Sequence, residues 1–441
     1  MTSLLTRAAG GSGAARAPGQ LPDSVAFYLL ASVIASFLAG ASAPTPLYAV
    51  YASAWHFSAI TTTVVFAVYA LAVLAALLTA GSLSDHIGRR PVLLAAIAAQ
   101  AVVMVVFATA GGMPQLVMAR IIQGLATGAA IGAIGAGLLD LDKAKGTIAN
   151  AVAPWVGFAA GPIGSGLLVQ FLPAPTRLVY LVLFAVFAAQ AVGVWLMRET
   201  AAPIPGALAS LRPTFTLPPA ARRPFLLALP ALIAVEALVG FYASLGPALV
   251  QHVANSRSIV LGGLPLFVLA AGAAVTVRLL HRRSARTAIL TGAGALLAGV
   301  GLVLLAVGTG SAAAFFAGTV VAGVGVGGGF QGAIRSVLPL AAANQRAGVL
   351  SVVWVVAYLA MGVPTVIAGF LTVHDGSVLA TAHQYGAALL VLAALTLIGS
   401  ARRREAVPAG TRRPHAGESP HRARRRPSTP HQRNDRRVRN R

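Results

Sequence analysis

Long apolar runs without a charged residue fill most of this chain, and short clusters of charged residues separate them. The first run, from Ser24 to Ser84, contains no Asp, Glu, Lys or Arg. It is long enough for two membrane-spanning helices, because one helix needs about 20 apolar residues to cross a bilayer. Trp55 and His56 suit a membrane interface, so we expect the break between these two spans near Ser53–Ser58.

The remaining charge-free runs predict ten further spans. Four lie within residues 91–119, 113–139, 147–176 and 178–197, and six lie near residues 225–250, 258–280, 287–308, 312–338, 348–371 and 380–400. We therefore expect an all-α membrane protein with twelve transmembrane helices in two pseudo-symmetric six-helix bundles. Its parts are an N-terminal tail (1–24), a first bundle (25–198), a connector (199–223), a second bundle (224–401) and a basic tail (402–441).

The composition agrees with lipid as the solvent for these helices. Hydrophobic residues make up 57% of the 441 residues and charged residues only 10%, whereas a soluble domain has about a quarter of its residues charged. The chain has no cysteine, which excludes disulfides and thiolate metal sites. Because no pair of histidines has the spacing of metal ligands, we expect no bound metal.

Arg and Lys residues are concentrated on one side of the predicted membrane. If the N-terminus is inside, the outside loops hold only Arg177 and Arg257, and most other basic residues lie in inside loops. Cytoplasmic loops carry such an excess. The distribution predicts a multi-pass protein of a bacterial inner membrane with both termini in the cytoplasm.

The tail from Arg402 to Arg441 differs in kind from the rest. It has 14 Arg and few large apolar residues, so we expect it to be disordered. Either it has no specific partner, or its charge attracts anionic lipid headgroups. It lacks the interleaved aromatic residues of a nucleic-acid-binding segment, so we expect no nucleic-acid partner.

Three pairs of Gly and Pro recur at nearly one offset, which indicates an internal repeat. The first two pairs are 202 residues apart and the third is 201 apart: Gly146 and Gly348, Pro162 and Pro364, Pro46 and Pro247. Transporters are commonly built from such related halves.

The predicted loop between spans two and three carries an ordered motif, Gly81-Ser-Leu-Ser-Asp85-His-Ile-Gly88-Arg89-Arg90. Glycines allow tight turns and close helix approach. We expect Asp85 to face the positive end of a helix in the other half and Arg89 to pair with a carboxylate, as a latch on the cytoplasmic side. An ordinary positive-inside turn is the alternative, but it accounts only for the two arginines.

This loop resembles the signature loop of the major facilitator superfamily, with His86 in place of the usual Arg or Lys. Arg120-Ile-Ile-Gln123-Gly124 in the fourth span resembles the family's Arg-x-x-Gln-Gly motif. The resemblance implies twelve helices and transport activity. It also implies that Asp140 is an acidic partner of the loop arginine.

A second Gly/Pro-rich stretch lies in the fifth span. It contains Gly157, Gly161, Pro162 and Gly166 and resembles the motif of the drug:proton antiporter branch, with Ser165 in place of one glycine. Such a stretch lets a helix bend and pack closely against a neighbour. Simple close packing is the alternative explanation.

Glu236 is the only carboxylate that we place deep in the bilayer. Ionisable residues at this depth are costly and usually functional, so Glu236 is a candidate for binding a proton or a cationic substrate. The alternative is a structural glutamate hydrogen-bonded between helices. Arg120 is the second candidate, and it either holds a counter-charge, attracts an anionic substrate or pairs with backbone carbonyls.

In the family that the chain resembles, spans one, four, seven and ten line the cavity. Here those spans offer few polar groups among Ala, Gly, Val and Leu, which suits a lipophilic or amphipathic solute. Our candidate proton and substrate site consists of Glu236, Arg120, Gln123, Tyr242 and Gln331, and Ser36, Thr45, Tyr48 and Thr127 are further polar residues of the cavity spans.

The leading hypothesis is proton-driven export of a small organic molecule by alternating access. An uptake symporter or uniporter on the same fold is the first alternative, and a membrane sensor or scaffold is the second. No nucleophile arrangement or phosphate-binding loop stands out, so we expect no enzyme activity. We expect a monomer that needs the bilayer, its substrate and a proton gradient, but no cofactor.

Overall fold

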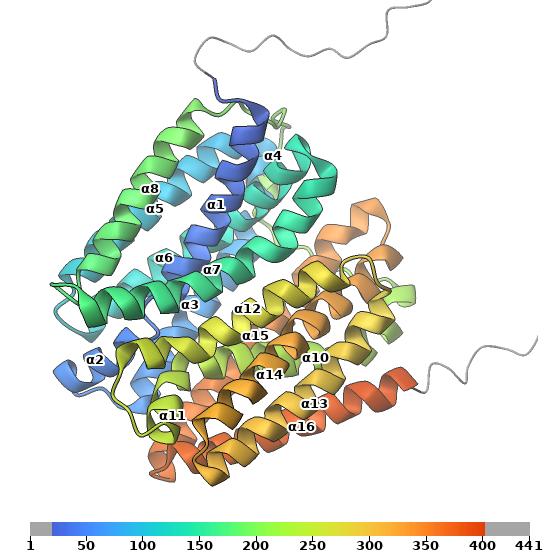
Figure 1. The fold of residues 1–441 in the computed structure, drawn as a ribbon. Coiled ribbons are helices and arrows are strands. Elements are labelled where there is room, and N and C mark those ends of the chain that lie inside the picture. The colour runs from blue at the N-terminus through green and yellow to red at the C-terminus, as the bar shows by residue number, and fades with distance from the viewer. Residues whose placement is uncertain (1–19, 402–441) are drawn as a thin grey trace, which may run out of the picture.

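The computed structural model describes residues 20–401, and every regular element in this range is a helix (Figure 1). Twelve of these helices are long and apolar enough to cross a membrane, which confirms the expected number. The predicted tail 402–441 and residues 1–19 lie outside the described residues.

The two halves of the chain form two bundles. The N bundle contains α1 (Asp23–Ser42), α3 (Ala59–Ala80), α5 (Arg89–Thr109), α6 (Met113–Leu141), α7 (Lys143–Phe171) and α8 (Leu178–Leu196). The C bundle contains α10 (Pro219–Ser244), α12 (Ile259–Leu280), α13 (Ala285–Thr309), α14 (Ala312–Val337), α15 (Arg346–His374) and α16 (Val378–Ala401). Short elements join them: α2 (Leu47–Trp55), α4 (Leu83–Ile87), α9 (Ala207–Ser210), α11 (Gly246–Val253), η1 (Leu338–Leu340) and η2 (Ala343–Gln345).

Several spans begin at a serine whose hydroxyl accepts a hydrogen bond from the first helical turn. These N-caps are Ser58, Ser258, Ser284 and Ser311. A cap satisfies a backbone donor that has no partner inside the helix. This matters more at a bilayer than in water, because lipid offers no replacement hydrogen bond.

The internal repeat is visible at the same place in both bundles. In the N bundle α1 ends at Ser42, and α2 starts directly after Pro46. In the C bundle α10 ends at Ser244, and α11 carries Pro247 in its first turn. The seventh span therefore covers residues 219–244, earlier than the expected 225–250. Pro247 has no N–H with which to continue the helix and its ring clashes with the preceding turn, so α10 ends before it and α11 begins at Gly246.

An even number of spans places residues 20 and 401 on the same side of the membrane, which we call the terminal face; the other side is the opposite face. The bundles pack together where α7 meets α12 and α3 meets α15 (Figure 1). The Thr45 hydroxyl donates to the carbonyl of Ala243 at 3.0 Å. The Gln170 amide oxygen accepts from the Ser258 hydroxyl at 2.7 Å and from the Val260 N–H at 3.1 Å. These bonds form a seal at the opposite face.

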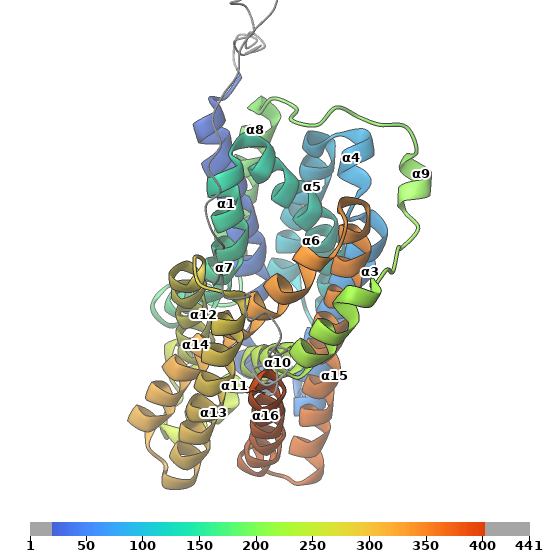
Figure 2. The same cartoon turned by 90° about the vertical axis from the view of Figure 1, so that its right-hand side faces the viewer.

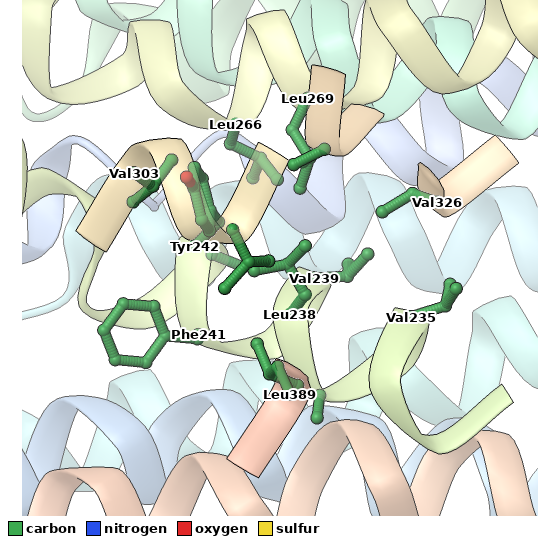
Figure 3. Packing of buried hydrophobic residues seen from close by; sticks show 14 of the residues in the cluster. Val235, Leu238, Val239, Phe241, Tyr242, Leu266, Leu269, Val303, Val326 and Leu389 are labelled. Carbon is green, nitrogen blue, oxygen red and sulfur yellow. The ribbon is translucent and has the colours of Figure 1, made fainter. Parts of the chain in front are cut away.

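The core of the C bundle forms around α10 (Figure 3). Here Leu238 and Tyr242 pack with Leu266 and Leu269 of α12. The same apolar cluster continues into the N bundle, where it includes Phe66 and Ala70 of α3 and Trp155 and Ala159 of α7. The two bundles thus share a continuous apolar contact in the middle of the molecule.

The connector between the bundles runs along the outside of the N bundle at the terminal face and passes α4 before it enters α10 (Figure 2). The Ser82 hydroxyl donates to the carbonyl of Ser210 at 3.2 Å, and the Ile204 N–H donates to the carbonyl of Asp85 at 3.4 Å. His86 Nδ1 lies 3.0 Å from the carbonyl oxygen of Ile204. The connector is therefore tied to the loop that carries the sequence motif.

Candidate functional site

Glu236 lies on α10 where the two bundles meet. It is buried, with 8% of its surface exposed. Within residues 20–401 no basic side chain forms an ion pair with it. Its carboxyl interacts electrostatically with Tyr358 of α15. A buried carboxyl without an ion-pair partner is stabilised when it binds a proton or a cation, because an isolated charge is costly in an apolar interior.

A continuous line of aromatic rings crosses from the N bundle to the C bundle beside this carboxyl. We call it the aromatic row. On α7, the Trp155 and Phe158 centroids are 6.4 Å apart. Trp155 meets Phe330 of α14 edge-on at 6.1 Å, and Phe330 lies 5.9 Å from Trp354 of α15.

The row ends at Tyr358, whose ring centroid lies 5.8 Å from that of Trp354. Tyr358 is near enough to Glu236 for the two groups to interact electrostatically. On α10, Val235 also touches the backbone position of Gly329, next to Phe330, because a Cβ at Gly329 would lie 2.8 Å from the Val235 methyl. Four of the five rings are only partly buried. Rings of this kind stack on flat apolar ligands and attract cations with their faces.

On the N-bundle side, Arg120 of α6 has no exposed surface. Its guanidinium donates to the Ala41 carbonyl at 2.7 Å, to the Gln123 amide oxygen at 2.8 Å and to the Tyr48 hydroxyl. The Cζ atom of the guanidinium lies 5.4 Å from the centroid of the Tyr69 ring. It lies 5.7 Å from the centroids of the Tyr48 and Phe107 rings. Hydrogen-bond acceptors and aromatic rings therefore stabilise this cation, in the role that a carboxylate commonly has.

Further polar side chains of the N bundle continue from Arg120. Gln100 of α5 donates to the Thr127 hydroxyl at 2.9 Å, and Thr127 donates to the Gln123 carbonyl at 2.8 Å. Three buried polar atoms of this group have no hydrogen-bond partner in the described structure: Gln100 Oε1, Arg120 Nε and Gln123 Nε2. Buried polar groups rarely stay unpaired, so this cluster has capacity for water.

The five residues of the candidate site lie in separate places. Arg120 and Gln123 are bonded to each other in the N bundle. In the C bundle, the Tyr242 and Thr319 hydroxyls are 3.0 Å apart, and Gln331 donates to the Val277 carbonyl at 3.3 Å. Glu236 lies on α10 between Val235 and Ala237, which belong to the apolar cluster shared by the two bundles. Of the other polar residues of the cavity spans, Ser36 accepts a hydrogen bond from Gln190 of α8 at 2.9 Å.

The motif loop at the terminal face forms a charge cluster within the N bundle. Arg89 bonds to Asp85 and donates to the Ser84 hydroxyl at 2.8 Å. Its Nε lies 3.5 Å from Asp140 at the end of α6. Asp85 thus pairs inside its own bundle, and not with a helix of the other half. This fits a molecule whose inter-bundle hydrogen bonds lie at the opposite face.

Glu199, which the sequence analysis did not single out, completes this cluster. Its carboxylate accepts from the backbone N–H groups of Arg89 at 2.8 Å and Arg90 at 3.0 Å, and so caps the start of α5. It also accepts from the N–H groups of Thr200 and Ala201, both at 3.0 Å. Gly88 makes this approach possible, because its φ of 101° favours glycine and a Cβ there would lie 2.6 Å from the Glu199 carboxylate.

The Gly/Pro stretch of α7 packs against a helix in each bundle. A Cβ at Gly157 would lie 2.1 Å from the Ala35 carbonyl of α1, and one at Gly161 would lie 2.3 Å from that of Ala39. On the side of α12, a Cβ at Gly166 would lie 3.0 Å from the Val260 Cα. One at Gly263 would lie 2.5 Å from the Pro162 carbonyl. The motif therefore brings α7 close to α1 and to α12.

Sequence comparison agrees with this architecture. Residues 28–365 match the model of the Major Facilitator Superfamily. The tetracenomycin C resistance and export protein of Streptomyces glaucescens is 37% identical over 107 residues, which cover 23% of this chain and 20% of that protein. The chain thus matches about a fifth of the length of this relative.

Solved structures with the same fold share little sequence. A bacterial homologue of the human lysosomal transporter Spinster, inward-facing and unoccupied, has a TM-score of 0.69 at 14% identity, with 89% of this chain and 99% of that chain covered. Its occupied form scores 0.64 at 15% identity, with 86% and 95% covered. The human organic anion transporter MFSD10 (TETRAN) scores 0.58 at 18% identity, with 86% and 99% covered. Since the family model covers most of both bundles, the chain belongs to the Major Facilitator Superfamily of membrane transporters.

Proposed function

We propose that this transporter exports a small, flat, amphipathic organic molecule in exchange for protons, from a bacterial inner membrane with its terminal face in the cytoplasm. The observation that carries the proposal is the position of Glu236 beside the aromatic row. A carboxyl with no ion-pair partner in the described structure offers a site for either a proton or a cationic group. The rings offer an apolar surface for the rest of the substrate.

The row also suggests how binding is linked to movement. Trp155 and Phe158 belong to the N bundle, whereas Phe330, Trp354 and Tyr358 belong to the C bundle. A substrate on this surface touches both halves and therefore binds differently when the halves rotate. A ligand shifts a conformational equilibrium only through such differential binding. When Glu236 takes up a proton, its attraction for a cationic substrate falls, which gives obligatory exchange.

The loop 81–90 is proposed as the gate of the terminal face. In the present arrangement Asp85 is paired with Arg89. In the alternate arrangement, with the terminal face closed, Asp85 is free to face a helix N-terminus of the C bundle, where a carboxylate is favourable. Replacing Asp85 with Asn leaves the fold intact and slows alternation in this scheme. Normal turnover of that variant contradicts the gate.

Two further observations bear on the type of transport. The partial relative from Streptomyces glaucescens is an export protein by name, which favours export. Arg120 favours organic anions as a second candidate class, because a buried guanidinium without a carboxylate attracts them. Its Nη donors are already bonded to Ala41, Gln123 and Tyr48, however, so an anion has to displace protein groups. We therefore place the anionic class second.

The test is a flux measurement in proteoliposomes with an imposed proton gradient and a panel of aromatic cations. Export requires substrate and protons to move in opposite directions, and Glu236→Gln abolishes this coupling while Glu236→Asp retains part of it. Movement in the same direction would establish uptake symport instead. Undiminished exchange by Glu236→Gln would remove the carboxyl from the mechanism.

A further inference from the structure

The two bundles balance their charges differently at the terminal face. In the N bundle, carboxylates lie beside the cations, as in the pairs Arg89–Asp140, Lys145–Asp142 and Arg198–Asp23. In the C bundle, residues 219–401 contain only two carboxylates, Glu236 within α10 and Asp375 at the opposite face. The arginines at its terminal face are Arg222, Arg223, Arg278, Arg282, Arg283, Arg286, Arg335 and Arg346. None of these forms an ion pair within the described residues.

A pocket of about 310 Å³ opens among these arginines, and we call it the arginine pocket. The ends of α10, α13, α14 and α16 and the short η1 meet around it. Arg286 and Arg335 line it together with the hydroxyl-bearing Ser336, and apolar side chains such as Leu227, Ile289 and Pro339 form the remaining wall. The pocket thus combines two guanidinium groups with an apolar surface.

Both guanidinium groups are held in place by backbone carbonyls. Arg335 donates to the carbonyls of Leu280 at 3.1 Å and Arg283 at 2.5 Å. Arg286 donates to the carbonyl of Ser400 at 3.4 Å. Carbonyls orient these cations but do not neutralise them. Arg286 also lies in the first turn of α13, where the helix dipole adds to the positive potential.

We propose that the arginine pocket binds the phosphate group of an anionic phospholipid. Arginine matches phosphate oxygens with paired N–H donors, and basic pockets between membrane helices at this level suit lipid headgroups. Free phosphate has the same oxygen atoms for the arginines, but it has no apolar part to contact the apolar wall of the pocket. The start of an acyl chain covers that wall, so the pocket fits a lipid better than a soluble anion. This site is independent of the proposed transport reaction.

The experiment uses the full chain in nanodiscs of phosphatidylcholine, with and without phosphatidylglycerol. We expect phosphatidylglycerol to raise the thermal midpoint of the wild type and to remain bound in native mass spectrometry. Arg286→Gln should weaken retention about tenfold, since one charge-assisted contact is lost. Arg223→Gln is the matched control, because Arg223 is exposed on the same face of the same bundle but does not line the pocket. Its retention of the lipid should equal that of the wild type.

A second variant keeps the test valid if Arg286→Gln does not fold. Ser336→Asp places a carboxylate in the pocket, so the arginines gain an internal counter-ion and lipid retention should fall. Equal loss in Arg223→Gln, or full retention in both pocket variants, would overturn the proposal. Inorganic phosphate that raises the midpoint as much as phosphatidylglycerol in phosphatidylcholine nanodiscs would overturn the assignment to lipid.

Discussion

The Trp155 indole meets the Phe330 ring edge-on across the boundary between the bundles, with 6.1 Å between centroids and 84° between the ring planes. Trp155 belongs to α7 and Phe330 to α14, so the rotation of the bundles that we propose for transport would change the distance between the two rings. The pair is the link through which the aromatic row passes from one half of the molecule to the other.

The first prediction concerns this pair. Trp155→Leu and Phe330→Leu should each raise the apparent KM for an aromatic substrate about five- to tenfold, because an aromatic contact contributes roughly 1 kcal/mol beyond its buried area. The double variant should lose less than the product of the two single effects. Transport kinetics of all four proteins provide the check, with Phe316→Leu on α14 as the control. Strictly multiplicative losses would show that the rings act separately.

The second prediction concerns the seal at the opposite face. Because the chain has no cysteine, thiols placed at Gln170 and Ser258 are the only ones present. A short bis-methanethiosulfonate cross-linker, which joins Gln170→Cys and Ser258→Cys through disulfide bonds, should stop transport because the bundles can no longer separate there. Reduction of the disulfides should restore transport.

The matched control for the cross-link lies at the same face but within one bundle. Gln384 donates to Asp375 at 2.9 Å, and both belong to the C bundle. A cross-link between Asp375→Cys and Gln384→Cys should leave transport unchanged. If the seal cross-link also left transport unchanged, the bundles would not need to part at this point.

The third prediction concerns Glu199. Its replacement by Ala leaves the first N–H groups of α5 without their acceptor, which should lower stability by about 1 kcal/mol, the usual cost of a lost helix cap. The loop of Arg89 should also loosen and turnover should slow. Thermal unfolding and transport rates check both effects. Thr200→Val removes only the hydrogen bond to Asp140. It should therefore lower stability and turnover much less than Glu199→Ala does.

The fourth prediction concerns pH and Asp142, the N-cap of α7. The Lys145 N–H hydrogen bond, aided by the Lys145 charge and the Ala144 N–H, holds the pKa of this carboxyl below its usual value of 3.8. A lowered pKa means that the carboxylate stabilises the fold above pH 3.8 and that this contribution is lost as the pH falls through the folded pKa. Asp142→Ala should therefore lower the thermal midpoint at neutral pH.

The midpoint difference between the wild type and Asp142→Ala should shrink in acid. Lys145→Met is the control, since it keeps the N–H donor but removes the ammonium group. Lys145→Met should also lower the thermal midpoint relative to the wild type at neutral pH, but by less than Asp142→Ala does. A difference that stays constant from neutral pH to pH 3 would mean that the cap does not depend on the carboxylate charge.

Much of the fold can be predicted from the charge pattern. An uncharged run that crosses lipid has to form a helix, because only then are its backbone N–H and C=O groups hydrogen-bonded. The expected break near Ser53–Ser58 lies between the end of α2 at Trp55 and the start of α3 at Ala59. The predicted start of the seventh span, near residue 225, was less accurate, because α10 begins at Pro219. Arg222 and Arg223 lie in its first turns, where charge is tolerated outside the apolar layer, so charge alone does not mark the helix start.

The candidate site was harder to predict, because its members depend on how the helices rotate and meet. The depth of Glu236 follows from its position in an apolar run. The aromatic row does not, since Trp155, Phe330 and Trp354 look like ordinary apolar residues along three distant spans. Glu199 was also missed, because its role as a cap depends on the approach of the end of α8 to the start of α5.

The seal contains no group that carries charge: its hydrogen bonds join hydroxyl, amide and backbone groups of Thr45, Ala243, Gln170, Ser258 and Val260. None of these groups gains or loses a proton between acidic and neutral pH. We therefore expect the strength of the seal to be independent of pH, and any pH-dependent opening of the opposite face to start at titratable groups elsewhere in the protein.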